Sequence, residues 1–197
     1  MTKILGITGG IGSGKSVVSH ILRVMEIPVY DTDSHAKVLN ESDSVIREGL
    51  IELVGEKVYT DKGLNRQLLS TYLFSSPQNT ERINKLIHPR VKNDFNLWAH
   101  DQSGYPLICI ESAILFESGF NSLVDDTISV IASEETRIQR VIQRDNSDIE
   151  KVKARIKSQI TDEQRINLSQ YVIINDGNKA LIPQVRKIIS HYFPNIL

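Results

Sequence analysis

The chain has 197 residues and a formal net charge of −1, with 40% hydrophobic and 24% charged residues. This composition excludes a disordered or low-complexity chain, and the near-neutral charge gives no electrostatic footprint for nucleic acid or an anionic membrane. No apolar run approaches the roughly 18 residues of a membrane span, and a single cysteine, Cys109, excludes an internal disulfide. We therefore expect a soluble, cytoplasmic protein with one main core.

The first thirty residues predict a strand–helix–strand unit. Lys3–Thr8 is a short β-type run that leads directly into a glycine-rich segment. Apolar residues at positions 17, 18, 21, 22 and 25 then recur at helical spacing, which predicts a helix from about Lys15. A second strand is expected over residues 27–30. This order implies a parallel sheet with a right-handed crossover.

Three later apolar runs, rich in Ile and Val, predict the other strands of a five-stranded sheet. They span residues 106–110, 127–132 and 171–174. Short continuous apolar runs are typical of parallel strands that are buried on both faces. Ser133 is expected to cap the helix after the second run, and the last helix is expected over residues 179–192.

Residues 34–104 contain no convincing strand for this sheet. Helical stretches are expected at 45–54, 66–74 and 81–99, the last interrupted at His88-Pro89. About seventy residues are too many for a simple crossover, so we predict a helical insertion domain over 34–104 and a second insertion over 137–170. The core then comprises residues 1–33, 105–136 and 171–197.

A phosphate-binding loop is predicted at residues 9–16, whose sequence GGIGSGKS fits G-x-x-x-x-G-K-[ST]. Glycines let the backbone N–H groups converge on phosphate oxygens, and the start of the following helix adds to the attraction for an anion. Lys15 is then expected to reach the β- and γ-phosphates, and the Ser16 hydroxyl to bind Mg²⁺. The alternative is a chance match at a glycine-rich turn, but the strand before it and the helix after it favour nucleotide binding.

Carboxylates follow two of the predicted strands. Asp31 and Asp33 come just after the second strand, where one of them could accept a proton from an attacking hydroxyl group. Glu111 ends the strand at 106–110 and resembles an acid that holds Mg²⁺ directly or through water. The alternatives are a helix N-cap for the first pair and a polar residue at a strand edge for Glu111.

Arg137, Arg140 and Arg144 lie three and seven residues apart, so one helix face can present all of them. Arginine forks stabilise the charge that develops during phosphoryl transfer. Because several acids share this stretch, a solvated ion-pair face is the alternative. The sequence has no N-K-x-D segment, which argues against a GTPase switch.

Taken in order, these features resemble the dephospho-coenzyme A kinase family over nearly the whole chain. The carrying segments are residues 8–16, 31–33, 63–66, 87–89, 114–117, 137–145 and 173–177. The chain departs from the family pattern where Glu111 replaces Asp, Ala113 replaces Pro, Lys37 replaces Arg, and Asn65 and Ile174 replace acids.

The resemblance implies an α/β fold: a P-loop NTPase core with a parallel five-stranded sheet flanked by helices, a helical substrate-binding insertion and an arginine-rich helical lid. It implies transfer of the γ-phosphoryl of ATP, with Mg²⁺, to the 3′-hydroxyl of the dephospho-CoA ribose. The products are CoA and ADP, and the reaction is the final step of coenzyme A biosynthesis. No nucleic acid or membrane partner is expected, and the protein is expected to be a monomer or a small homo-oligomer.

The resemblance also implies residue roles. Asp33 is expected to act as the base, helped by Lys15 and Arg140 in catalysis, with Arg137 a weaker candidate. The residues expected to bind ATP are Gly12, Ser13, Gly14, Lys15, Ser16, Val17, Arg144, Asn175 and Gly177, with Ser16 on the metal. Those expected to bind the acceptor are Asp31, Lys37, Arg66, His88 and Glu111.

Three other functions compete with this interpretation. Another small-molecule kinase would share the loop and differ in its acceptor pocket. A nucleotide-dependent regulatory switch would hydrolyse ATP without an acceptor. A purely structural α/β domain would bind no ATP.

Overall fold

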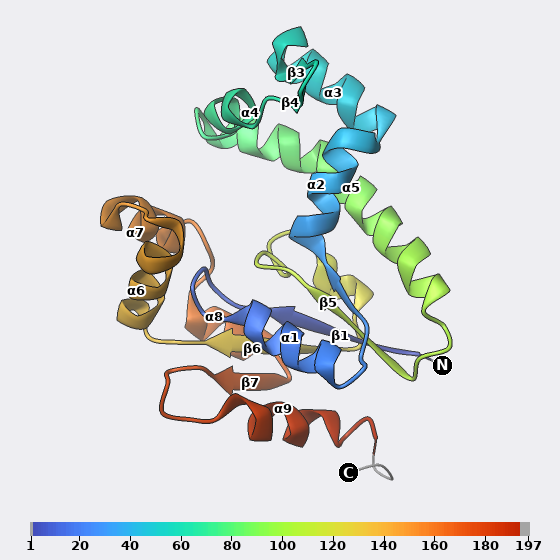
Figure 1. Ribbon diagram of the computed structural model, residues 1–197, viewed down its shortest axis with the longest axis vertical. Coiled ribbons are helices and arrows are strands. Elements are labelled where there is room, and N and C mark those ends of the chain that lie inside the picture. The colour runs from blue at the N-terminus through green and yellow to red at the C-terminus, as the bar shows by residue number, and fades with distance from the viewer. Residues whose placement is uncertain (1, 194–197) are drawn as a thin grey trace. The chain divides into compact units, whose positions relative to one another are not determined.

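The computed structural model describes residues 2–193. The chain forms two compact units: one comprises Met1–Tyr30 and Asp101–Leu197, and the other comprises Asp31–His100. We call them the core unit and the helical unit. Figure 1 shows the sheet in the first and only helices and a small hairpin in the second.

A five-stranded parallel sheet forms the centre of the core unit, as predicted. The strand order is β2-β5-β1-β6-β7. The strands are β1 (Lys3–Thr8), β2 (Val29–Asp31), β5 (Leu107–Glu111), β6 (Asp126–Ile131) and β7 (Tyr171–Ile174). Ile7 of β1 lies opposite Glu111, which belongs to β5 itself and not to the turn after it.

Two helices cover one face of this sheet. Leu5 and Ile7 of β1 pack in one buried cluster with Leu22 of α1 (Lys15–Val24) and Val185 of α9 (Leu181–Ile189). The sole cysteine, Cys109 on β5, is fully buried in the same cluster, and burial raises the pKa of its thiol. Ile108 and Ile110, which alternate with Cys109 along β5, are buried too. The strand is therefore covered on both faces, which explains its continuous apolar sequence.

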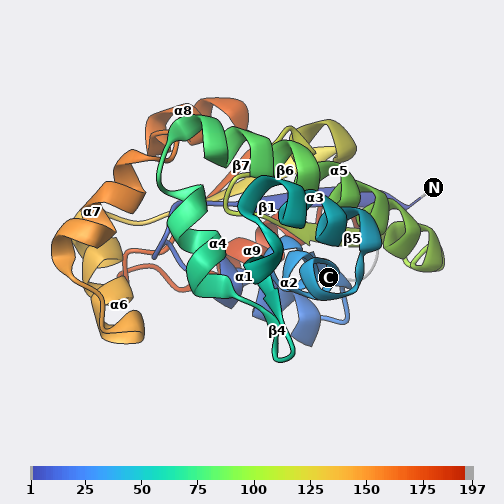
Figure 2. The ribbon, with the colours of Figure 1, turned by 90° about the horizontal axis from the view of Figure 1, so that it is seen from above.

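The segment between β6 and β7 is helical. It contains α6 (Glu134–Asp145), α7 (Ile149–Lys157) and α8 (Asp162–Leu168). The Ser133 cap is confirmed, since its hydroxyl accepts a hydrogen bond from the Thr136 amide at 3.2 Å. Helices α6 and α7 lie side by side in both views (Figures 1 and 2), whereas α8 contacts β6.

The helical unit has its own small core, built around Ile46, Leu50, Val58 and Ile83. Its helices are α2 (Thr32–Ser42), α3 (Ser44–Val54), α4 (Arg66–Leu73) and α5 (Pro77–Asp101), with a short 3-10 turn at Glu56–Val58. A two-residue hairpin, β3 (Tyr59–Thr60) and β4 (Gly63–Leu64), joins α3 to α4 and was not predicted. Figure 2 shows β4 beside α2, with which it is in contact.

The predicted break at His88-Pro89 is wrong, because α5 continues through Pro89 as one helix of 25 residues. A proline inside a helix removes one backbone hydrogen bond and crowds the preceding turn, so it weakens a helix without always ending it. Ile83, Val91 and Phe95 are buried on either side of the proline, and their packing holds both halves in one helix. None of the helices in residues 2–193 combines the length and apolarity needed to cross a membrane.

Candidate active site

The predicted phosphate loop connects β1 to α1, and α1 begins at Lys15 as expected. Gly12 and Gly14 have φ angles of 78° and 93°, a region that side chains rarely allow. A Cβ atom at Gly12 would also lie 2.5 Å from the main-chain oxygen of Arg137. The motif glycines are therefore required by both backbone conformation and space.

The carbonyl groups of the loop are held by one amide of the loop itself and by two side chains from outside it. Gly10 O accepts from the Ser13 amide at 3.0 Å, Ile11 O accepts from Arg137 Nε at 3.0 Å, and Ser13 O accepts from Asn175 Nδ2 at 2.8 Å. Within the described residues, by contrast, the amides of Gly12, Gly14 and Ser16 donate to no acceptor. Unpaired amides at the start of a helix form an anion-binding site.

A buried ion-pair network supports the loop, and sequence reasoning missed most of it. Arg137 is buried, and its Nη1 donates to Asp162 at 3.0 Å, while Arg165 Nη1 donates to the other oxygen of Asp162 at 2.9 Å. Gln159 Oε1 accepts from the Ile11 amide at 2.9 Å. Arg137 thus ties the loop to α8. The Thr161–Gln164 capping box marks the start of α8 and was a usable sequence signal for this region.

Arg140 differs from Arg137 although it lies only one turn further along α6. Arg137 is paired with Asp162, whereas Arg140 forms no ion pair among the described residues. The Nη1 of Arg140, like Nη2 of Arg137, is buried and has no hydrogen-bond partner in the part of the chain that the structure describes. A Cβ atom at Gly14 would lie 3.9 Å from this nitrogen, which places it beside the loop. The buried hydroxyl of Ser13 also has no partner there. Unsatisfied buried donors are costly, so these groups fit an anion such as a nucleotide phosphate.

The other residues predicted to bind ATP differ in whether they contact the phosphate loop. Asn175 lies at the loop and donates to it, as described above. Arg144 instead has a side chain that is 64% exposed, and its Nε lies 2.6 Å from Asp145. Gly177 lies in a turn that the Asp176 carboxylate organises by accepting from the Asn178 and Lys179 amides. Among residues 2–193, no hydrogen bond or ion pair links Arg144 or Gly177 to the loop residues.

Glu111 ends β5 directly opposite Ile7, one residue before the end of β1, so it lies at the same sheet edge as the loop. Ser16 and Val17 are exposed in the first turn of α1. No group of three or more His, Cys, Asp or Glu side chains able to hold a metal occurs in residues 2–193. Mg²⁺ commonly binds through few protein oxygens together with substrate phosphates, and the Ser16 hydroxyl suits that role.

In the helical unit the two predicted aspartates have different surroundings. Asp31 is the N-cap of α2: its Oδ1 accepts from the Asp33 and Ser34 amides at 3.0 and 3.3 Å, and its Oδ2 from Ser34 Oγ at 2.7 Å. The Asp33 carboxylate is exposed and takes part in no hydrogen bond or ion pair among the residues described. The first carboxylate therefore has a structural role, while the second is available for proton transfer.

The predicted acceptor residues of the helical unit lie in two places. Lys37 and Arg66 line a hollow of about 270 Å³. His88 lies inside α5, and burial, with a smaller contribution from the Lys92 charge, lowers the pKa of its imidazole. His88 is therefore neutral at pH 7 and suits a structural role or a neutral hydrogen bond better than phosphate binding.

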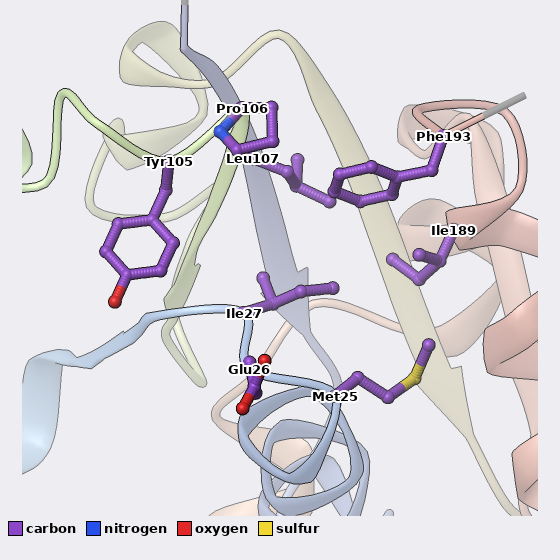
Figure 3. A pocket seen from close by; sticks show the side chains of 8 residues that line it. All are labelled: Met25, Glu26, Ile27, Tyr105, Pro106, Leu107, Ile189 and Phe193. Carbon is purple, nitrogen blue, oxygen red and sulfur yellow. The ribbon is translucent and has the colours of Figure 1, made fainter. Parts of the chain in front are cut away.

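A second hollow, of about 350 Å³, belongs to the core unit (Figure 3). Side chains from Ile27, Leu107, Ile189 and Phe193 line it. Leu107 begins β5, whereas the phosphate loop follows the end of β1, so the hollow lies at the opposite edge of the sheet. Its lining is mostly apolar, with Glu26 as the one charged residue, which makes it unsuitable for phosphate.

Comparisons with known proteins agree with this geometry. Residues 3–180 match the family model described as dephospho-CoA kinase. The chain is 47% identical over 192 residues to a dephospho-CoA kinase of Bacteroides fragilis, covering 98% of this chain and 94% of the relative. The crystal structure of TT1252 from Thermus thermophilus is similar, with a TM-score of 0.83, 28% identity and coverage of 100% and 98%. Dephospho-CoA kinase from Campylobacter jejuni shares the fold, with a TM-score of 0.71, 22% identity and full coverage of both chains.

Proposed function

The chain belongs to the dephospho-CoA kinase family, and from this premise we propose how its residues perform the reaction. The reaction moves the γ-phosphoryl group of ATP to the 3′-hydroxyl of dephospho-CoA and yields CoA and ADP. It is the final step of coenzyme A biosynthesis. The two substrates bind to different parts of the chain: the core unit binds ATP, and residues 34–104 bind dephospho-CoA.

The phosphate loop binds the triphosphate of ATP. The observation that best supports this role is the set of unpaired amides at Gly12, Gly14 and Ser16 beside the unpartnered Nη1 of Arg140. Each of these donors gains an acceptor when phosphate oxygens occupy the loop. Gly177 and Asn175, after β7, border the adenine.

Lys15 and Arg140 stabilise the transition state. Charge spreads over the oxygens of the transferred phosphoryl group, and fixed cations near it lower the barrier. Lys15 bridges the β- and γ-phosphates, and Arg140 contacts the γ-phosphate through its unpartnered nitrogen. Arg144 joins them after it leaves Asp145, as the part of residues 137–170 around α7 closes over the nucleotide and excludes water.

The Ser16 hydroxyl holds Mg²⁺, with Glu111 supporting the ion directly or through water. When bound, the ion neutralises charge on the β- and γ-phosphates. The fit rests on the exposed hydroxyl in the first turn of α1 and on a carboxylate at the same sheet edge.

Asp33 acts as the general base. Its carboxylate is exposed and unpaired, so it can accept the proton of the 3′-hydroxyl. The 3′-oxygen then forms a bond to the γ-phosphorus, and the bond from that phosphorus to the β–γ bridging oxygen breaks as ADP leaves. Asp31 fixes the start of α2 and thereby the position of Asp33.

Acceptor binding involves Lys37 and Arg66, with His88 contributing a neutral imidazole. The reaction takes place in the cytoplasm, by a monomer or a small homo-oligomer, without nucleic acid or membrane partners.

Incubation of the purified protein with ATP, Mg²⁺ and dephospho-CoA tests the proposal, with CoA detected by mass. Adenosine, AMP and pantetheine phosphate are parallel acceptors, and Lys15→Ala is the control. We expect CoA from the natural chain and none from the variant. Phosphorylation of another acceptor alone would contradict the substrate, and ATP hydrolysis without any phosphorylated acceptor would favour a nucleotide switch.

A further inference from the structure

We infer that the hollow between α2 and α4 holds the pantetheine arm of the acceptor and that Phe74 recognises this arm. The inference rests on the proposed function and goes beyond it, because it assigns one part of the acceptor to one part of the helical unit. The hollow is formed entirely within that unit.

Three polar residues of α2 lie on one face of the helix. Asp33, Lys37 and Asn40 are four and three residues apart, a spacing that aligns side chains along a helix. At a rise of 1.5 Å per residue, Lys37 lies about 6 Å and Asn40 about 10 Å along the axis from Asp33. An acceptor whose 3′-hydroxyl lies at Asp33 can therefore extend along this face toward the hollow.

Two cationic side chains line the hollow. Lys37 from α2 and Arg66 from α4 both line it, and neither forms an ion pair with any described residue. In dephospho-CoA a diphosphate follows the ribose. Lys37, one helical turn beyond Asp33, and Arg66, which lines the same hollow, therefore match the order of groups in the acceptor. Arginine and lysine side chains are the usual partners of such phosphates.

Asn40, the next polar residue along this face of α2, has a side-chain oxygen without a hydrogen-bond donor among the described residues. Asn40 lines the hollow, and its Oδ1 is buried without a hydrogen-bond partner in residues 2–193. Burial of such an oxygen is unfavourable unless a donor reaches it. The pantetheine arm carries two amide N–H groups after the diphosphate, and an amide N–H supplies the missing donor.

The hollow also has an apolar part of its lining. Leu64, Leu69, Leu73 and Phe74 line it. Leu69 and Leu73 also pack on the core of the unit, but Phe74 does not and is 72% exposed. An aromatic side chain that is exposed beside a hollow gains burial when an apolar ligand covers it. The methyl and methylene groups of the arm have this character.

The test uses two fragments as competitive inhibitors against dephospho-CoA: 4′-phosphopantetheine, which carries the arm, and ADP-ribose, which carries adenosine diphosphate without it. Phe74→Ala should raise the inhibition constant of 4′-phosphopantetheine and the KM of dephospho-CoA roughly fivefold. The inhibition constant of ADP-ribose and the KM of ATP should change less than about twofold. Leu97→Ala, at a residue of α5 that is 62% exposed, is the matched control and should change none of them.

Lys37→Gln should weaken both fragments, because both carry phosphate, whereas Lys62→Gln on the hairpin should weaken neither. Equal inhibition constants for 4′-phosphopantetheine in Phe74→Ala and Leu97→Ala would overturn the inference while leaving the kinase activity intact. If the natural chain makes no CoA, the proposed function fails. Calorimetric titration of 4′-phosphopantetheine into the natural chain and Phe74→Ala then decides the inference separately.

Discussion

The two proposed binding sites, the phosphate loop and the hollow between α2 and α4, differ in the groups that they offer to a ligand. At the loop, backbone amides point at the ligand, and side chains such as Arg137 and Asn175 hold the carbonyls away. In the hollow, side chains on two helices provide the contacts themselves. Backbone amides can bind any triphosphate, and their positions depend on the fold around the loop. Side chains can be specific for one acceptor, and they can be substituted without unfolding the helical unit.

The largest effect that tests this difference is expected at Asp33. Asp33→Asn removes the proton acceptor but keeps the size of an exposed side chain in α2, so turnover should fall roughly 10²- to 10⁴-fold. ATP affinity, measured by titration, should stay within about twofold. Asp61→Asn, an exposed acid of the hairpin, is the control and should remain active. An equal loss of turnover and ATP affinity would contradict the assignment of the base.

Arg140 should give the next largest effect. Arg140→Ala removes a buried donor that the protein leaves unpartnered, so turnover at saturating substrates should fall roughly 10²- to 10³-fold. Thermal stability should be unchanged or slightly higher, since an unsatisfied buried group is lost. Turnover equal to that of the natural chain would show that Arg140 does not contact the transferred group.

Arg137→Met should lower stability more than turnover, which is the reverse of the effect expected for Arg140→Ala. Methionine keeps much of the apolar stem but loses the bonds to Ile11 O and Asp162, while Arg165 still neutralises Asp162. We expect the free energy of unfolding to fall by about 1–3 kcal/mol, which corresponds to roughly 3–10 °C in Tm. Calorimetry of the variant checks this. A normal Tm with a large loss of turnover would instead assign Arg137 to the chemistry.

The smallest expected effect is a pH-dependent change in the stability of the helical unit, caused by Asp43. Burial acts to raise the pKa of Asp43, but the Ile46 amide and Arg90 Nε, at 3.0 and 2.8 Å, outweigh it and lower the pKa. A carboxylate with a lowered pKa adds stability above its unfolded pKa of about 3.9 and loses it as the pH falls further.

Asp43→Asn keeps an N-capping side chain for α3 but removes this charge. It should lower Tm by no more than about 3 °C at pH 6, and the difference should disappear on acidification below the pKa of Asp43. Thermal melts from pH 6 to about pH 2 measure it, because the stabilisation is lost between the unfolded pKa and the lower pKa of the folded state. A difference that stays constant over this range would exclude the ion pair as its source.

Local sequence patterns predicted the parts of the molecule that depend on local geometry. The loop at residues 9–16, the start of α1 and the Ser133 cap need only neighbouring residues, and the structure has them where expected. The same holds for the five strands, because a strand buried on both faces has a distinctive apolar sequence.

Features that depend on distant partners could not be predicted in this way. Arg137 and Arg140 share a helix face in sequence, but Asp162 pairs with only one of them. Asp31 and Asp33 looked equivalent until side-chain orientation made the first an N-cap. Pro89 suggested a break, but packing around it keeps α5 continuous. Lys37 and Arg66 were predicted to bind the acceptor, but that they line one hollow depends on how α2 and α4 are arranged.

The burial of Cys109 has a consequence for an enzyme whose product carries a thiol. Exchange between CoA and a protein disulfide, or capture of oxidised CoA by a protein thiol, requires an accessible thiolate. This chain has one cysteine, which is fully buried in the hydrophobic core of the sheet, and burial raises the pKa of its thiol. The folded enzyme therefore has no thiol that its own product, or that product's disulfide, can modify, and CoA can be released into a changing redox environment without inactivating the protein that made it.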